Sequence, residues 1–242
     1  MLAIFYKEIS GFFSSLVAYI TIAAFLIVTW LFLWVFPDSS ILDYGYAGLD
    51  SFFNLAPYIF MFLIPAITMR SFAEEKKDGT FELLATRPVT DWDIVLGKFL
   101  ASLSIIFLTL LPTLIYYFTI YHLGVVKGNV DAGAVLGSYI GLMLLGCAFA
   151  SIGLFGSSLS KSQIIVFTIS VFLCFIAFSG FDSFSQILSM QSIGHFISAF
   201  GINQHYQSIS RGVLDSRDLI YFISFCAFFL LLTKTIVGSR KW

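Results

Sequence analysis

Charged residues are scarce in this chain of 242 residues. Asp, Glu, Lys and Arg make up 11% of it and hydrophobic residues 59%, whereas soluble globular domains average about 25% charged and roughly 45–50% apolar residues. The mean hydropathy is +0.94. A soluble domain of this length needs far more charge on its surface, so the composition excludes the ordinary soluble classes and predicts an integral membrane protein.

The sequence also lacks the motifs of phosphate and zinc chemistry. No stretch matches GxxxxGK[ST], because the pair Gly97 and Lys98 is followed by Phe99 and has no upstream glycine. HExxH is absent, and the apolar stretches contain no Asp, Glu or Arg, which argues against a proton relay, a voltage sensor or a wide ion pore. We therefore expect no catalytic residue, no ATP hydrolysis by the chain itself, no cofactor and no nucleic-acid partner.

Cysteine and histidine are few and scattered. Cys147, Cys174 and Cys226 lie in apolar stretches and form no CxxC pair, so we expect small buried hydrophobic residues rather than a disulfide framework or metal ligands. A metal site built from His195 and His205 is an alternative. Polar loop histidines are more common than ligands at such spacing, and no metal is expected.

Apolar stretches long enough to cross a bilayer recur along the chain. About 20 helical residues cross a hydrocarbon core of about 30 Å. The fold expected is an all-α polytopic membrane protein with six transmembrane helices, in which residues 1–242 form a single transmembrane domain without a linker. The predicted spans cover residues 16–36, 52–69, 99–121, 135–159, 164–181 and 219–237.

Two local patterns refine these spans. Pro57 and Pro65 in the second span, and Pro112 in the third, each remove a backbone donor, which predicts kinked or broken helices. The fourth span repeats small residues at a four-residue spacing that lets helix backbones approach closely. Burial against the other spans is the expected use, with dimerisation as an alternative. The pairs are Gly137 and Gly141, Gly146 and Ala150, and Gly153 and Ser157.

Two shorter helices are expected at the membrane interfaces. Residues 1–13 carry an apolar face with Lys7 opposite, which predicts an N-terminal amphipathic interfacial helix; a frayed start of the first span is the alternative. Between the fifth and sixth spans, a helical face ending at Gly201 is too short to cross the membrane, which predicts an outer re-entrant or interfacial helix. That face consists of Ile193, Phe196, Ile197 and Phe200.

Basic residues divide unevenly between the two sides of the membrane. Six spans put both termini on one side, and that side carries every Lys and Arg except Lys127, Arg211 and Arg217. Because cytoplasmic loops carry the excess of bases, the sequence predicts cytoplasmic N- and C-termini for a multi-pass protein of the cell inner membrane.

Residues 70–98 form the longest polar interruption and are predicted to be a cytoplasmic loop. Gly79 is a natural helix stop. Thr80 is then expected to cap a short helix with Glu82 in its first turn, where the helix dipole favours an acid. Pro88 limits that helix to about two turns.

The short helix carries an apolar face formed by Phe81, Leu84 and Ala85. After it, Thr90 with Asp93 is a weaker relative of the capping box, which predicts a third helix that runs through Lys98 into the third span. A short amphipathic helix held between two spans suits a groove on a partner. The alternative is a solvated hairpin that only connects the spans.

The polar loop resembles the signature of type-2 ABC exporter permeases. The matching residues are Glu74, Glu75, Gly79, Thr80, Glu82, Leu83, Leu84, Pro88, Val89, Gly97 and Lys98. A second stretch resembles the segment before the last span in the same family and consists of Ser210, Arg211, Gly212, Val213, Leu214, Asp215, Arg217, Asp218 and Leu219. Within the family the chain is most similar to the gliding-motility-associated permease subunit (the F-type subunit) of Bacteroidetes. Arg87, Asp91 and Trp92 depart from that pattern.

The resemblance implies a permease subunit without its own ATPase site. It would work in the lipid bilayer with two copies of a separate ABC ATPase and with a second permease or a copy of itself. The ATPase-docking residues implied are the coupling helix and its flanks, Glu74, Glu75, Gly79, Thr80, Phe81, Glu82, Leu83, Leu84 and Pro88. The outer segment and possible gate would comprise Ile193, Phe196, Ile197, Phe200, Arg211, Gly212 and Asp215. A membrane scaffold that anchors a cytoplasmic partner and transports nothing is the alternative function.

Overall fold

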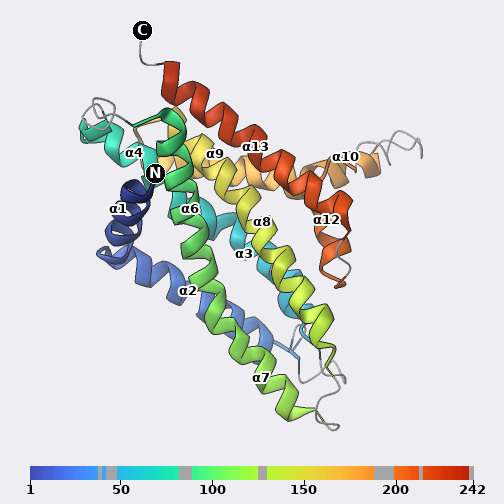
Figure 1. Ribbon diagram of the computed structural model, residues 1–242. Coiled ribbons are helices and arrows are strands. Elements are labelled where there is room, and N and C mark those ends of the chain that lie inside the picture. The colour runs from blue at the N-terminus through green and yellow to red at the C-terminus, as the bar shows by residue number, and fades with distance from the viewer. Residues whose placement is uncertain are drawn as a thin grey trace.

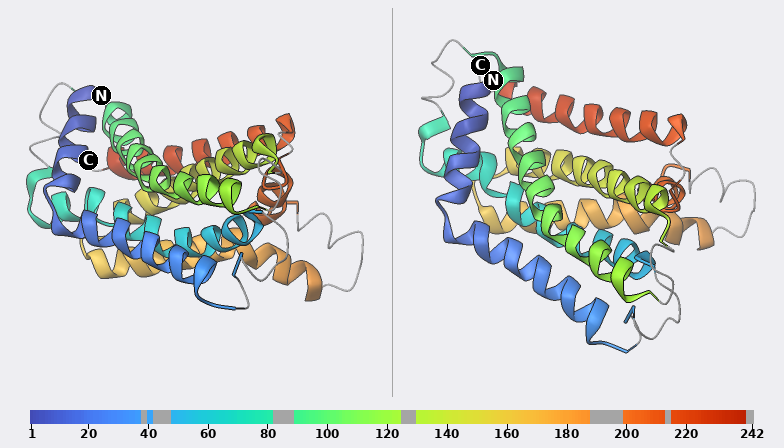
Figure 2. Two further views of the ribbon diagram at one scale, coloured as in Figure 1. Left: turned by 90° about the horizontal axis from the view of Figure 1, so that it is seen from below. Right: turned by 60° about the horizontal axis from the view of Figure 1, so that its bottom comes forward.

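The computed structural model describes residues 1–37, 40–41, 48–81, 89–124, 130–187, 199–212 and 215–239. These residues form helices and connecting turns, without a strand among them. Figure 1 shows the arrangement, and Figure 2 gives two further views. The elements are α1 (Leu2–Phe13), α2 (Leu16–Trp34), α3 (Asp50–Thr68), α4 (Arg70–Lys77), α6 (Asp91–Leu110), the 3₁₀ turn η1 (Leu111–Thr113), α7 (Leu114–Leu123), α8 (Ala132–Leu159), α9 (Gln163–Phe175), the π-helical turn η2 (Ile176–Gly180), α10 (Phe181–Ile187), α12 (Ile202–Ile209) and α13 (Ser216–Gly238).

Six helical stretches are long and apolar enough to cross a membrane, which confirms the predicted all-α class and the six spans. Several stretches extend beyond the predicted limits. The helix of the third span begins at Asp91, as the predicted cap at Thr90 requires, because Thr90 and Asp93 form a full capping box at the start of α6. The second helical stretch ends in polar residues at Lys77, and the third begins in polar residues at Asp91. A count of apolar residues alone misses both ends.

Prolines act differently in the second and third spans. Neither Pro57 nor Pro65 interrupts α3; the helix instead ends at Thr68, and α4 begins at Arg70 after the single residue Met69. Pro112 does change the helix, because it lies in the short 3₁₀ turn that joins α6 to α7. The second span is therefore interrupted at Met69 and not at Pro57 or Pro65, and the sequence around Met69 gives no signal for an interruption.

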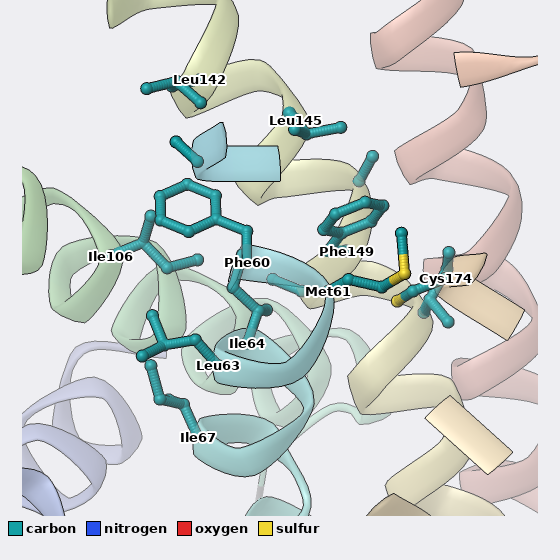
Figure 3. Packing of buried hydrophobic residues seen from close by; sticks show 14 of the residues in the cluster. Phe60, Met61, Leu63, Ile64, Ile67, Ile106, Leu142, Leu145, Phe149 and Cys174 are labelled. Atoms are coloured by element: carbon teal, nitrogen blue, oxygen red, sulfur yellow. The ribbon is translucent and has the colours of Figure 1, made fainter. Parts of the chain in front are cut away.

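Helix α8 lies at the centre of the bundle, between α3, α6, α9 and α13. In the apolar windows of α3–α4 and α8, 61% of residues are buried, compared with 22% in α2 and in α13. Figure 3 shows Phe60 and Ile64 of α3 meeting Ile106 of α6 and Phe149 of α8 in this core. The outer helices α2 and α13 therefore leave broad apolar faces exposed on the outside of the bundle.

Small residues make the close contacts of α8, as its spacing predicts. A Cβ atom added at Gly153 would lie 2.0 Å from Oγ1 of Thr68 in α3, and one at Gly146 would lie 3.0 Å from Ile106 in α6. At the other end of α8, a Cβ atom at Gly137 would lie 2.9 Å from Cα of Gly212. The repeat in α8 therefore serves packing inside this chain.

Candidate functional site

Helix α4 continues the second span past the break at Met69, and a side chain of α8 holds it there. The hydroxyl of Ser157 accepts hydrogen bonds from the backbone N–H groups of Phe72 (2.9 Å) and Ala73 (3.1 Å) and donates one to the carbonyl of Met69 (3.1 Å). The Lys76 ammonium donates to the carbonyl of Ser158. Helix α4 is thus fixed to the end of α8 through its backbone and through one lysine.

A buried cluster of charges joins α4 to α1 and α6. The side chain of Lys98 is 0% exposed, and its Nζ lies 2.7 Å from Oε1 of Glu8 and 3.0 Å from Oε2 of Glu75. The same ammonium donates a hydrogen bond of 2.6 Å to the carbonyl of Ser71. Lys7 pairs with the other oxygen of Glu75. Lys98 and Glu75 thus pair where water has little access, with Glu8 partly buried and Lys7 half-exposed at the edge of the cluster, which makes Lys98 and Glu75 costly to remove.

Two more contacts fix the ends of α1. Arg70 donates from Nη1 to the hydroxyl of Ser15, the residue that caps α2 (2.9 Å). The terminal ammonium of Met1 lies 3.3 Å from the carboxylate of Asp93 in the first turn of α6. We call α1, α4 and residues 91–98 of α6 the platform. Figure 2 shows that the N-terminus lies at the same end of the bundle as the end of α13.

The platform also contacts the last helix. The Lys234 ammonium lies 5.5 Å from the centre of the Trp92 ring, in cation–π geometry. The contact gives Trp92, which departs from the family pattern, a packing role between α6 and α13.

The predicted docking residues separate into an exposed and a buried group. Glu74 is half-exposed and pairs with Arg70, with 3.7 Å between Nε and Oε2. Glu75 faces inward into the charge cluster, where it is 8% exposed and pairs with Lys98. Phe81 is also buried, and its ring meets Phe72 edge-on at 6.2 Å between centres.

Gly79 and Thr80 form the exposed turn that follows α4. Gly79 has a φ of +71°, which confirms it as the left-handed stop that favours glycine. Thr80 and Phe81 are already helical, so Gly79 rather than Thr80 stands before the new helix. The Thr80 hydroxyl donates to the carbonyl of Glu75 (3.4 Å). The remaining predicted docking residues, Glu82, Leu83, Leu84 and Pro88, lie outside the described residues.

Residues 199–212 lie at the opposite end of the bundle, and we call them the distal segment. They include three residues of the predicted outer segment and possible gate, namely Phe200, Arg211 and Gly212. Ile193, Phe196 and Ile197 are outside the described residues, whereas Phe200 lies in an exposed turn and its carbonyl accepts a hydrogen bond from the hydroxyl of Tyr221 (2.7 Å). The described short helix, α12, begins after Gly201, where the predicted one ends. Sequence reasoning therefore missed α12.

The distal segment is tied to α3 and α8. Tyr206 donates from its hydroxyl to the carbonyl of Phe53 in α3 (2.6 Å), and Ser138 of α8 donates to the carbonyl of Ser210 (2.8 Å). Gly212 has a φ of +84°, and a Cβ atom there would lie 2.5 Å from Cα of Ala134. Backbone therefore contacts backbone at this joint, which only glycine permits.

The polar residues near the distal segment have structural partners. Asp215 caps α13 by accepting from the N–H of Arg217 (3.0 Å), and Arg211 is exposed. The two ring nitrogens of His205 face the carboxylate of Asp218 (2.7 Å) and the carbonyl of Ala199 (3.0 Å). His195, the other half of the alternative metal site, lies outside the described residues.

Comparison with known proteins gives one result that covers the chain. No curated protein matches it in sequence. A family model described as "ABC-2 family transporter protein" matches residues 2–238. Members of this family are membrane components that normally lack an ATPase site of their own and work with an ABC ATPase. The chain belongs to the ABC-2 family of transporter proteins.

Proposed function

We propose that this chain is the permease subunit of an ABC-type exporter and that a separate ATPase docks on residues 74–88. The observation that carries the proposal is the anchoring of the platform. Helix α4 and the start of α6 are the two arms of that segment, and the buried contacts of Lys98 tie both arms to α1. A partner that pushes on the exposed turn between the arms would therefore move span helices and not a loose loop.

The distribution of bases supports a cytoplasmic platform. Among the described residues, the end of the bundle that holds the platform carries Lys7, Arg70, Lys76, Lys77, Lys98, Lys161 and Lys234, whereas Arg211 and Arg217 lie at the other end. Because bases gather on the cytoplasmic side of inner-membrane proteins, we place the platform and both termini in the cytoplasm, where an ATPase can reach them.

The assembly we propose has two copies of the ATPase and two permeases. Helix α2 is mostly unburied within this chain and exposes large apolar side chains such as Ile20, Ile27 and Trp30. In the assembly, part of this exposed apolar surface would contact lipid. The rest would contact the second permease, which is another six-span permease or a copy of this chain. Residues 74–88 of each permease would receive one ATPase.

Co-purification tests the docking segment. We expect Glu82→Lys, and deletion of residues 79–84, to lower the yield of the ATPase bound to the tagged permease at least about tenfold, because each alters the proposed contact itself. The amount of permease in the membrane fraction should stay the same. Asp50→Lys, a charge reversal at the exposed start of α3, is the matched control and should keep the ATPase bound.

The same experiment separates this proposal from its rivals. Recovery of the ATPase at wild-type yield with both docking variants would overturn docking on residues 74–88. Failure of the unaltered permease to bring down any ABC ATPase, together with recovery of some other cytoplasmic protein, would favour the scaffold instead.

We further propose that the exporter acts in gliding motility, on the resemblance of the loop and pre-span motifs to the Bacteroidetes subunit. Deleting the gene should abolish colony spreading, and the unaltered gene should restore it. The Glu82→Lys gene should not restore spreading, because it supplies a permease without its motor. A deletion strain that spreads normally would refute this role while leaving export itself open to the co-purification test.

A further inference from the structure

The break between α3 and α4 is closed by a residue that belongs to neither helix. The first turn of a helix leaves backbone N–H groups without intrahelical partners, and Met69, at the cap position of α4, offers no side-chain acceptor. The Ser157 hydroxyl supplies the acceptor for Phe72 and Ala73 and returns a hydrogen bond to Met69. One oxygen atom of α8 thus sets the direction in which α4 leaves the second span.

Ser157 is fully buried, at 0% exposure, so water does not reach its hydroxyl to take over these bonds. One turn earlier on the same helix, Gly153 brings α8 against Thr68 at the end of α3. The glycine therefore fixes the spacing of α8 and α3, and the serine fixes the orientation of α4 at the same joint.

At its far end, α8 makes the same two kinds of contact with the distal segment. Ser138 donates to the carbonyl of Ser210, and Gly137 lies against the backbone of Gly212. Helix α8 is one uninterrupted helix of 28 residues, and the 19 residue steps from Ser138 to Ser157 span about 29 Å. A rigid helix with a backbone-bonding serine near each end connects the platform to the distal segment.

We propose that Ser157 is a positioning residue for energy coupling: it locks α4 to α8, so that movement of the docking segment reaches the distal segment through α8. The inference rests on the proposed function, since it presupposes an ATPase on residues 74–88. It adds to that function the route by which the force crosses the membrane. Ser157→Ala removes one oxygen atom and the three hydrogen bonds that lock the backbone of α4 to α8, while the bond from Lys76 to the Ser158 carbonyl and the exposed docking turn are left as they are.

The test uses the complex of the permease and its ATPase in lipid nanodiscs. A cysteine placed at Gln204, which is exposed on α12, reports on the distal segment through its rate of labelling by a membrane-impermeant maleimide. The chain without this cysteine gives the background from Cys147, Cys174 and Cys226. Rates are compared without nucleotide and after trapping with ATP and vanadate, beside the yield of bound ATPase and its rate of hydrolysis.

We expect trapping to change the labelling rate at least about threefold in the unaltered chain, and to leave it unchanged in Ser157→Ala, with ATPase binding and hydrolysis retained. Ser158→Ala is the matched control. Ser158 is equally buried and adjacent, but its hydroxyl donates only within α8, to the carbonyl of Phe155 (2.7 Å). This variant should behave like the unaltered chain.

Three results would overturn the inference while leaving the proposed function standing. They are a full change of labelling in Ser157→Ala, an equal loss in Ser158→Ala, and no change in the unaltered chain with ATPase bound. Loss of ATPase binding in Ser157→Ala alone would also overturn it, because the serine would then serve docking and not transmission. If the unaltered chain binds no ATPase, the proposed function itself fails, and the inference fails with it.

Discussion

Replacing Lys98 with methionine is expected to lower the free energy of unfolding by about 3–5 kcal/mol, the usual cost of removing one partner from a buried ion pair. The ammonium of Lys98 is 0% exposed and lies within 3.0 Å of carboxylate oxygens of Glu8 and Glu75. Methionine fills a similar volume but leaves the partly buried Glu8 without its lysine, and the buried Glu75 with only Lys7, which is 54% exposed, to balance it. Unfolding titrations with SDS in mixed micelles would measure the loss.

Two further variants separate charge burial from general damage. Lys77→Met removes an exposed lysine from the same platform and should change the free energy by less than about 1 kcal/mol. Combining Lys98→Met with Glu8→Gln and Glu75→Gln removes the uncompensated charges and should recover most of the loss. If Lys98→Met is no more harmful than Lys77→Met, the charge cluster does not hold the platform together.

The sequence predicts those parts of the fold that depend on neighbouring residues. The apolar stretches alone give the class and the six spans. The stop at Gly79 and the cap at Thr90 are also local, because glycine tolerates a positive φ and a threonine hydroxyl accepts from an amide three residues on. The cap at Thr90 also predicts that the helix of the third span continues into the polar residues Asp91–Lys98, as it does.

The platform could not be predicted in the same way, because its contacts join residues far apart in the sequence. Glu8 and Lys98 are 90 positions apart, and Ser157 and Met69 are 88 positions apart. Charged residues usually face water, so the sequence alone predicts an exposed Glu75. The ion pair between Glu75 and Lys98 is visible only in the structure. The break at Met69 likewise depends on a hydroxyl from α8, whereas the local signals, Pro57 and Pro65, lie within an unbroken helix.

The distal segment shows a related limit. The predicted helix with the apolar face of Ile193, Phe196 and Ile197 lies outside the described residues, whereas the described helix α12 begins after Gly201 and carries polar residues such as Asn203 and His205. Tyr206 and Ser210 hold this helix through bonds to Phe53 and Ser138, on two different spans. These contacts join residues far apart in the sequence, so no local pattern predicts α12.

The second large effect is expected at Gly153, where alanine should lower the free energy of unfolding by about 1–3 kcal/mol through overpacking. The added Cβ would lie 2.0 Å from Oγ1 and 2.9 Å from Cβ of Thr68. Thr68 is 1% exposed and its hydroxyl is bonded to the carbonyl of Ile64, so it has little room to turn away. The same SDS titration measures this change.

Gly11→Ala is the control for the intrinsic preference of helices for alanine over glycine, because a Cβ atom there meets nothing within 4 Å. It should be neutral or stabilising. Adding Thr68→Ala to Gly153→Ala removes the closest contact, so the two substitutions together should cost less than their separate effects added. Strict additivity would mean that α3 and α8 are not held at contact distance by this pair. Gly153 and Ser157 are one helical turn apart on α8. The close approach of α8 to α3, on which the coupling energy between Gly153 and Thr68 depends, therefore also brings the Ser157 hydroxyl within reach of α4.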